Sequence, residues 1–325
     1  MPIATHETFG SFTVRPVLDG FGAEVEGVPF DQVPLSDDDI KTLTAISDKY
    51  AVLIFRNTGL DDDRHVAFSK QLGELEFCPK ANPHFPPPPF NGPDQPDRFS
   101  SPHLFDAGNT NLDGTIVKKG TRRWAYNKGN AMWHTDSIFN QHRSKYSLLL
   151  AHAVPSDGGD TGFADTRRAF NDLPEAKKEE LRQYTIEHDL WHSRKLAAPE
   201  EFATQTAHEL AAKQPAYHKL VQTGPDGRET LVIAAHSKLV VGWDLEKSQK
   251  LIWELIDHCT QPQYVFKAKW YQPGDMIWWD NRASMHTATP FSDQMEVRDM
   301  RRTTVFDDGP DAYGVPAPLG DMPAA

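Results

Sequence analysis

The hydrophobic and polar positions divide the chain into short apolar segments separated by glycine, proline and charged clusters. Residues 11–27 alternate β-branched or aromatic residues with others and are interrupted by glycine, which predicts two short strands. Residues 36–49 begin with Ser36 and three aspartates and continue with apolar residues at helical spacing, which predicts a helix. A short buried strand is expected over 51–55, followed by a second helix over 61–72.

From residue 113 onward, strand-like segments dominate, and helical patterns interrupt them near 167–182, 200–213 and 245–258. Many strands with inserted helices, and no regular strand–helix alternation, favour a mostly β fold with decorating helices, in one domain spanning 1–325. The predicted strands lie at 114–118, 131–137, 145–153, 184–189, 216–223, 230–234, 263–270, 275–280 and 297–306.

A proline-rich segment interrupts the pattern between Pro79 and Pro102. Proline at this density blocks both a helix and a central strand, so an irregular excursion is expected. Excursions of this length in compact domains are usually functional lids or disordered segments, and we favour a lid over 79–112. The Pro/Ala-rich tail, 309–325, is expected to be loosely held.

The amino-acid composition argues against several classes of protein. The chain has 34 Lys+Arg against 46 Asp+Glu and a net charge of −12, which argues against nucleic acid as a partner. No stretch approaches 18 apolar residues and the N-terminus lacks the features of a secretory signal, so no membrane association is expected. Only two cysteines occur, Cys78 and Cys259, which indicates a reducing, cytoplasmic location rather than a disulfide framework.

The candidate chemistry begins with His134 and Asp136, two residues apart on the segment predicted as a strand over 131–137. Alternate residues of a strand project from the same face, so the imidazole and the carboxylate can converge on one point. A distant second histidine would complete the two-His-one-carboxylate facial triad, which holds Fe(II) and leaves coordination positions open. His286 follows an apolar strand and a turn at Asp280 and Asn281, so it is the candidate third ligand.

The segment RDMRRTTVF follows His286 and carries two arginines on one predicted strand face, Arg298 and Arg302. Guanidinium groups on a buried strand are costly unless an anion meets them, and a dicarboxylate would supply one. An ion pair with a core Asp or Glu is the alternative for each arginine.

These motifs together resemble the taurine/dichlorophenoxyacetate dioxygenase family of Fe(II)- and 2-oxoglutarate-dependent oxygenases. The resemblance runs from about Gly20 to about Asp307 and rests on the order and spacing of five motifs. They are GELEF near 73–77, His134-x-Asp136, Gly158-Gly159-Asp160-Thr161, WDNR before His286, and Arg298-x3-Arg302. The resemblance implies a distorted double-stranded β-helix, or jelly roll, with Fe(II), 2-oxoglutarate and O2 as cofactor and cosubstrates.

The resemblance also implies roles for individual residues. His134, Asp136 and His286 look like the iron ligands, and Thr161 and Arg298 like the pair that holds the distal carboxylate of 2-oxoglutarate. Arg302 and Asn130 match positions that contact the prime substrate. Trp133 and Trp279 look like aromatic walls beside the metal, or alternatively like ordinary core residues.

One segment departs from the family pattern. In taurine dioxygenase the residues after the GEL motif supply a His and a Tyr to the substrate, whereas Cys78 and Ala81 fall about there in this chain. The difference argues against taurine as the substrate, and Lys80 or His84 are the candidates to replace that pair.

The expected reaction is oxidation of a C–H bond in a small, anionic organic substrate, with release of succinate and CO2. A zinc-dependent hydrolase using the same His/Asp/His site is the alternative, and a non-catalytic jelly-roll module is a second one. A homo-oligomer, either a dimer or a tetramer, is expected from the family. The prime substrate is not readable from the motifs.

Overall fold

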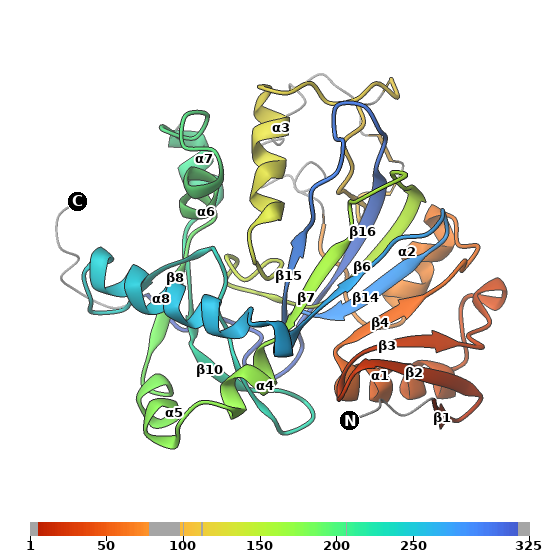
Figure 1. Ribbon diagram of the computed structural model, residues 1–325, viewed down its shortest axis with the longest axis horizontal. Helices are drawn as coiled ribbons and strands as arrows, with labels where there is room; N and C mark the ends of the chain where they lie inside the picture. The colour runs from red at the N-terminus through yellow and green to blue at the C-terminus, as the bar shows by residue number, and fades with distance from the viewer. Residues whose placement is uncertain (1–5, 78–97, 100, 112, 206, 318–325) are drawn as a thin grey trace.

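A computed structural model describes residues 6–77, 98–99, 101–111, 113–205 and 207–317. Within these residues the largest layer is an eight-stranded sheet, antiparallel except where β3 pairs with β4 (Figure 1). Its strands, in spatial order, are β1 (Glu7–Phe9), β2 (Phe12–Leu18), β3 (Phe21–Glu26), β4 (Val52–Phe55), β14 (Met276–Asp280), β6 (Ser144–Ala153), β16 (Asp299–Phe306) and β5 (Phe105–Asp106).

Smaller antiparallel sheets complete the β structure of the described part of the chain. One has the order β13 (Val265–Ala268), β7 (Thr161–Asp165) and β15 (Ser284–Ala288). Another has the order β12 (Ser237–Val240), β8 (Thr185–His188) and β9 (Ala216–Lys219), and β10 (Val221–Thr223) pairs with β11 (Glu229–Leu231).

Helices cover the sheets from outside (Figure 1). Those in the described residues are α1 (Asp37–Tyr50), α2 (Asp62–Lys70), α3 (Arg122–Asn127), α4 (Thr166–Asn171), α5 (Glu175–Leu181), α6 (Leu190–Ala197), α7 (Ala207–Ala212) and α8 (Leu245–Cys259). Single 3-10 turns occur at η1 (Phe30–Gln32), η2 (Lys128–Ala131) and η3 (Pro262–Tyr264). None of these helices is long and apolar enough to cross a membrane.

The core lies on both faces of β14. Trp278 packs edge-on against Phe68 of α2, with 6.3 Å between ring centroids. Trp279 points to the opposite face, where Phe163 of β7 lies 5.6 Å away. A strand covered on both sides needs apolar residues at consecutive positions, which explains the unbroken run from Met276 to Trp279. The large sheet is therefore packed between helices and the sheet that carries β15.

Many predicted elements are confirmed. The helices expected over 36–49 and 245–258 are α1 and α8, and Ser36 caps α1 by accepting a hydrogen bond from the Asp39 amide. The strands expected over 51–55, 145–153 and 297–306 are β4, β6 and β16.

Other predicted helices and strands are wrong. Residues 114–118 form no strand: a bend lies at Gly114, whose φ is +80°, and Ile116 makes only an isolated bridge with Thr110. The helix expected over 167–182 is two helices, α4 and α5, because Pro174 begins a new one. Of the helix expected over 200–213, only α7 forms, whereas α6, β7 and β15 were not expected at all.

Most of the predicted lid, 79–112, and the end of the predicted tail, 309–325, lie outside the described residues, as do Cys78, Lys80, Ala81 and His84. The described end of the lid is held by ion pairs, because Asp106 of β5 lies 3.2 Å from Arg98 and 2.8 Å from Arg123 of α3. The start of the tail is also held, since Tyr313 forms an isolated bridge with His142. Cys259 is buried, with a free thiol.

Candidate active site

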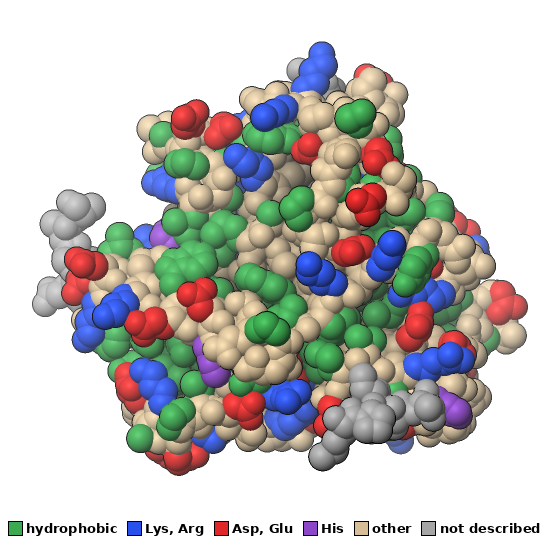
Figure 2. All heavy atoms as spheres, in the orientation of Figure 1, with side chains coloured by type: hydrophobic (Ala, Val, Ile, Leu, Met, Phe, Trp, Pro, Cys, Tyr) green, Lys and Arg blue, Asp and Glu red, His purple; other side chains and the backbone are tan. Residues whose placement is uncertain are grey.

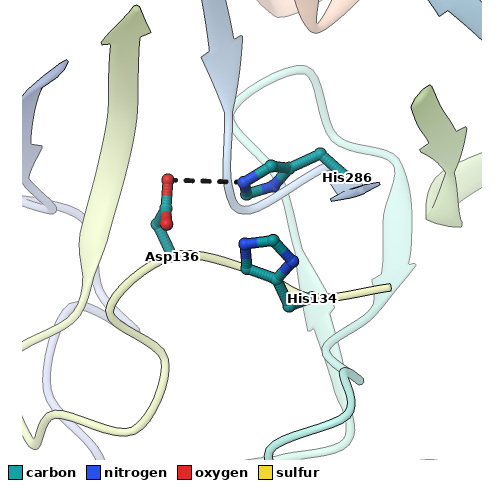
Figure 3. A group of neighbouring side chains, drawn as sticks. All are labelled: His134, Asp136 and His286. Atoms are coloured by element: carbon teal, nitrogen blue, oxygen red, sulfur yellow. Dashed lines mark ion pairs between the residues drawn. The ribbon is translucent and has the colours of Figure 1, made fainter. Parts of the chain in front are cut away.

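Three side chains predicted as metal ligands meet in the interior. One potential ligand atom from each of His134, Asp136 and His286 lies within 4.8 Å of the others, and all three residues are buried. In Figure 3 the two imidazoles and the carboxylate turn toward a common space. Asp136 Oδ2 lies 3.6 Å from His286 Nε2.

The backbone brings the two histidines together. The His134 amide donates to the His286 carbonyl at 2.9 Å, and the His286 amide donates back to the His134 carbonyl at 2.8 Å. This single bridge adds His134 to the free edge of β15, and the two ring centroids are 4.0 Å apart. A two-residue antiparallel bridge therefore brings together ligands that are far apart in sequence.

The strand predicted over 131–137 does not exist, so Asp136 reaches the site by another route. The chain turns directly after the His134 bridge, and Ser137 has a positive φ of 57°. The Asp136 amide donates to Asn281 Oδ1 at 3.2 Å, and Ser147 donates to Asp136 Oδ2 at 2.8 Å. Hydrogen bonds from outside the segment, rather than strand alternation, orient this carboxylate.

The electrostatics suit a cation between these groups. Burial alone would raise the pKa of Asp136, but Arg302 and the two histidines outweigh it and lower this pKa to about 2. Burial lowers the pKa of His134 and lowers that of His286 well below its usual value, so both imidazoles are neutral at pH 7. The His134 Nδ1–H donates to the Met132 carbonyl at 2.8 Å, which leaves Nε2 as the electron-pair donor.

Arg302 contacts the triad directly. Its guanidinium pairs with Asp136 Oδ1, and its charge lies 4.7 Å from the ring centroid of Phe105. The alternative of an ion pair with an acidic residue is therefore realised at this position, although Arg302 also lines the cavity in front of the triad.

Arg298 is buried without an acidic partner among the described residues. Its Nε donates to the Gly159 carbonyl and its Nη1 to the Ala107 carbonyl, each at 3.2 Å. Burial lowers the pKa of Arg298 to about 10, and the more distant Asp160 carboxylate offsets part of the effect. A guanidinium satisfied only by backbone carbonyls keeps a net charge that an anion can neutralise.

Two cavities contain residues that the sequence marked as site candidates. The triad cavity includes His134, Asp136 and Arg302 in its walls and measures about 80 Å³. The Arg298 cavity includes Arg298 and measures about 300 Å³. Asn130 lines both cavities. Thr161 does not line either cavity, and its Oγ1 accepts a hydrogen bond from Trp270 Nε1 at 3.1 Å.

The two tryptophans singled out from the sequence differ in position. Trp279 is buried, 4.7 Å from the His286 ring, and its Nε1 donates to Asn281 Oδ1 at 3.1 Å. Trp133 packs against the apolar cluster around α8. Trp279 therefore belongs to the core and also packs beside His286, one of the predicted metal ligands.

Sequence reasoning missed the residues that hold Asp136 in place. Asn281 donates to Ser147 Oγ at 3.0 Å and to Ser144 Oγ at 3.2 Å, and Ser147 in turn bonds Asp136. Asn281 lies within the WDNR motif, so its place in a conspicuous turn was the available signal. Ser147 sits in the middle of β6 and offered none.

Comparison with known proteins agrees with this geometry. The profile of the family described as "Taurine catabolism dioxygenase TauD, TfdA family" matches residues 13–304. The chain belongs to this family. It is therefore a 2-oxoglutarate-dependent dioxygenase, and the resemblance inferred from its motifs is confirmed.

Individual relatives are similar over nearly their whole length. An alpha-ketoglutarate-dependent 2,4-dichlorophenoxyacetate dioxygenase of Burkholderia sp. (strain RASC) is 34% identical, covering 85% of this chain and 88% of the relative. The dioxygenase of the same name from Cupriavidus pinatubonensis is 33% identical, covering 92% and 99%. The crystal structure of AAD-2 in complex with Mn(II) and N-oxalylglycine has a TM-score of 0.80 and 30% identity, covering 96% and 99%.

Proposed function

We propose that this dioxygenase holds Fe(II) on His134, Asp136 and His286 and oxidises a small, anionic organic substrate. The observation that carries the proposal is the convergence of three ligand atoms, together with a buried arginine, Arg298, that has no acidic partner among the described residues. Two neutral imidazoles and one carboxylate are the donor set of the non-haem iron oxygenases, and they leave positions open for other ligands.

Arg298 is proposed to bind the distal carboxylate of 2-oxoglutarate. Its fit to a carboxylate follows from its buried, incompletely matched charge and from its position in the wall of the larger cavity. Thr161 is proposed as its partner, since a hydroxyl that accepts from Trp270 keeps its own proton to donate. With Fe(II) and 2-oxoglutarate bound, the site would use O2 to oxidise a C–H bond, releasing succinate and CO2.

The protein itself positions the groups that would hold the metal, and their burial keeps water away from them. Asn281 and Ser147 hold the Asp136 carboxylate, and the bridge between His134 and His286 holds the imidazoles. Arg302 and Asn130 are proposed to contact the prime substrate, because both line the cavity that also contains His134 and Asp136.

The fold proposal is a distorted double-stranded β-helix within one domain. Antiparallel pairing of β14 with β6 and of β6 with β16, packed against the antiparallel β13–β7–β15 sheet, supports it. Relatives that act on 2,4-dichlorophenoxyacetate support an aryloxyalkanoate as the first substrate to test.

A turnover assay tests the proposal. Purified protein with Fe(II), ascorbate, O2 and 2-oxoglutarate should release succinate, and 2,4-dichlorophenoxyacetate should be the first stimulating compound tried. Replacement of Fe(II) by Zn(II), or the substitution His134→Ala, should abolish succinate release. The exposed variant Lys195→Gln is the matched control and should retain it. Hydrolysis of a substrate with Zn(II) and no succinate would favour the hydrolase instead, which no observation here supports.

A further inference from the structure

Arg194 brings a second guanidinium into the triad cavity from an element that the motifs did not mark. It lies on α6, which packs against η2, and it is only 6% exposed. Its side chain lines the same cavity as His134, Asp136 and Arg302. The residue is absent from every motif that carried the family resemblance.

Within the described part of the chain, no acidic group pairs with the charge of Arg194. The other two cations of the cavity are accounted for, because Arg302 pairs with Asp136 and Lys213 donates to Asn140 Oδ1 at 2.8 Å. Among the described residues Arg194 has no ion pair, and its buried Nε has no hydrogen-bond partner. Its guanidinium instead lies 4.0 Å from the ring centroid of Tyr126. A buried guanidinium left in this state is costly unless an anion binds it.

The backbone makes space for this guanidinium at Gly129, next to Asn130. A Cβ built on Gly129 would lie 1.8 Å from Arg194 Nη1, so no larger residue fits while Arg194 stays in place. Gly129 lacks a positive φ, so its conformation alone does not require glycine. A side chain at position 129 would therefore displace the guanidinium of Arg194 from its present place.

The rest of the cavity wall is aromatic. Phe77, Phe105, Phe139 and Tyr126 line it together with the charged groups. Aromatic side chains around a cationic group favour a ligand that has a flat apolar ring and one anionic group.

We propose that Arg194 is a second anchor, besides Arg302, for the anionic group of the prime substrate, with an aryl-substituted carboxylate as the test case because relatives act on 2,4-dichlorophenoxyacetate. The proposal rests on the proposed function of the same site. Arg302 pairs with Asp136 and also lines the cavity, whereas Arg194 has no ion pair among the described residues and offers its charge to the substrate. A planar guanidinium can make two parallel hydrogen bonds to a carboxylate, which lysine cannot reproduce.

Calorimetric binding to the protein loaded with Mn(II) and 2-oxoglutarate tests this without turnover. The probes are 2,4-dichlorophenoxyacetate and its uncharged analogue 2,4-dichlorophenoxyethanol. Arg194→Gln should weaken binding of the acid by roughly 10- to 100-fold, the range of a lost charged hydrogen bond, and change binding of the alcohol less than threefold. Arg194→Lys should restore only part of the loss, and the exposed Lys195→Gln on the same helix should behave like the wild type.

Gly129→Ala provides a second, independent arm. The added methyl group should displace the guanidinium and weaken binding of the acid, but it should have no further effect in the Arg194→Gln background. Equal losses for the acid and the alcohol in Arg194→Gln would show a merely structural role and overturn the proposal.

Unchanged binding of the acid in Arg194→Gln would also overturn it. If the wild type binds no aryl carboxylate across a series of ring sizes, the substrate class is wrong. Succinate release with Fe(II) and 2-oxoglutarate would still stand in that case, so failure of the Arg194 proposal is distinguishable from failure of the proposed function.

Discussion

Arg298 places a positive charge in the interior where only backbone carbonyls contact it. A residue in such surroundings gains more from binding a carboxylate than an exposed arginine would, because water competes less for both groups. Arg302 differs from Arg298 in this respect, because Asp136 already pairs with the charge of Arg302.

Substitution of Arg298 by glutamine should therefore weaken 2-oxoglutarate binding by about 100-fold or more, because two charged hydrogen bonds of about 1.5 to 3 kcal/mol each would be lost. Affinity for Mn(II) should change only a few-fold, because Arg298 does not contact the triad. Calorimetric titrations of Mn(II), and of 2-oxoglutarate into the Mn(II)-loaded protein, measure the two separately. The exposed Arg168→Gln is the control, and parallel losses of both affinities in Arg298→Gln would contradict the assigned role.

At the scale of elements, the site depends on β15, an edge strand whose open side pairs with the irregular segment around His134. β15 pairs with β7 along one side, where His286 is opposite Phe163, and its other side receives His134. Helices contribute by holding the surrounding sheets, and α8 does so with an apolar face that includes Leu251, Ile252 and Leu255.

The N-terminus of α8 offers a test of how much one helix end contributes. Asp244 accepts a hydrogen bond from the Lys247 amide at 2.8 Å and thereby satisfies one of the unpaired donors of the first turn. Asp244→Ala should lower the free energy of unfolding by about 1 kcal/mol. Urea unfolding followed by circular dichroism measures this, and the exposed mid-helix variant Glu254→Ala should stay within about 0.5 kcal/mol of the wild type. A loss no greater than that of the control would show that the cap adds nothing.

At the scale of the whole molecule, acidic and basic side chains intermingle on the visible surface (Figure 2), whereas several histidines are buried. Burial lowers the pKa of His65 to about 4 and that of His218 to about 4. In the unfolded chain a histidine titrates near 6.5. Between these values the unfolded state binds more protons than the folded state, so stability rises with pH.

We therefore expect the free energy of unfolding to fall as the pH decreases from about 6.5 to about 4, by up to about 1.4 kcal/mol per pH unit for each such histidine. Urea unfolding at several pH values measures this slope. His65→Asn should reduce the slope over the same window, whereas replacement of His6, which is exposed, should leave it unchanged. A slope that is identical in His65→Asn and in the wild type would contradict the role of His65.

The amino-acid sequence by itself indicated the three residues that converge in the interior and are proposed to hold the metal, the arginine proposed for the cosubstrate, and the mostly β class. It could do so because residue type and spacing carry that information: His134 and Asp136 two apart, and Arg298 and Arg302 four apart after His286. Strong local patterns also determined α1, α8 and the buried strands.

Tertiary structure alone decided how these residues are held and which charges remain unmatched. Asp136 is oriented by Asn281 and Ser147 and paired with Arg302, and none of these contacts follows from the spacing of the motif. The strand expected over 131–137 failed because hydrogen bonds to distant segments outweighed the local β-preference of this stretch. Arg194 enters the cavity only because α6 packs on η2 at Gly129. These two segments are far apart along the chain, so the local sequence pattern of neither one indicates the contact.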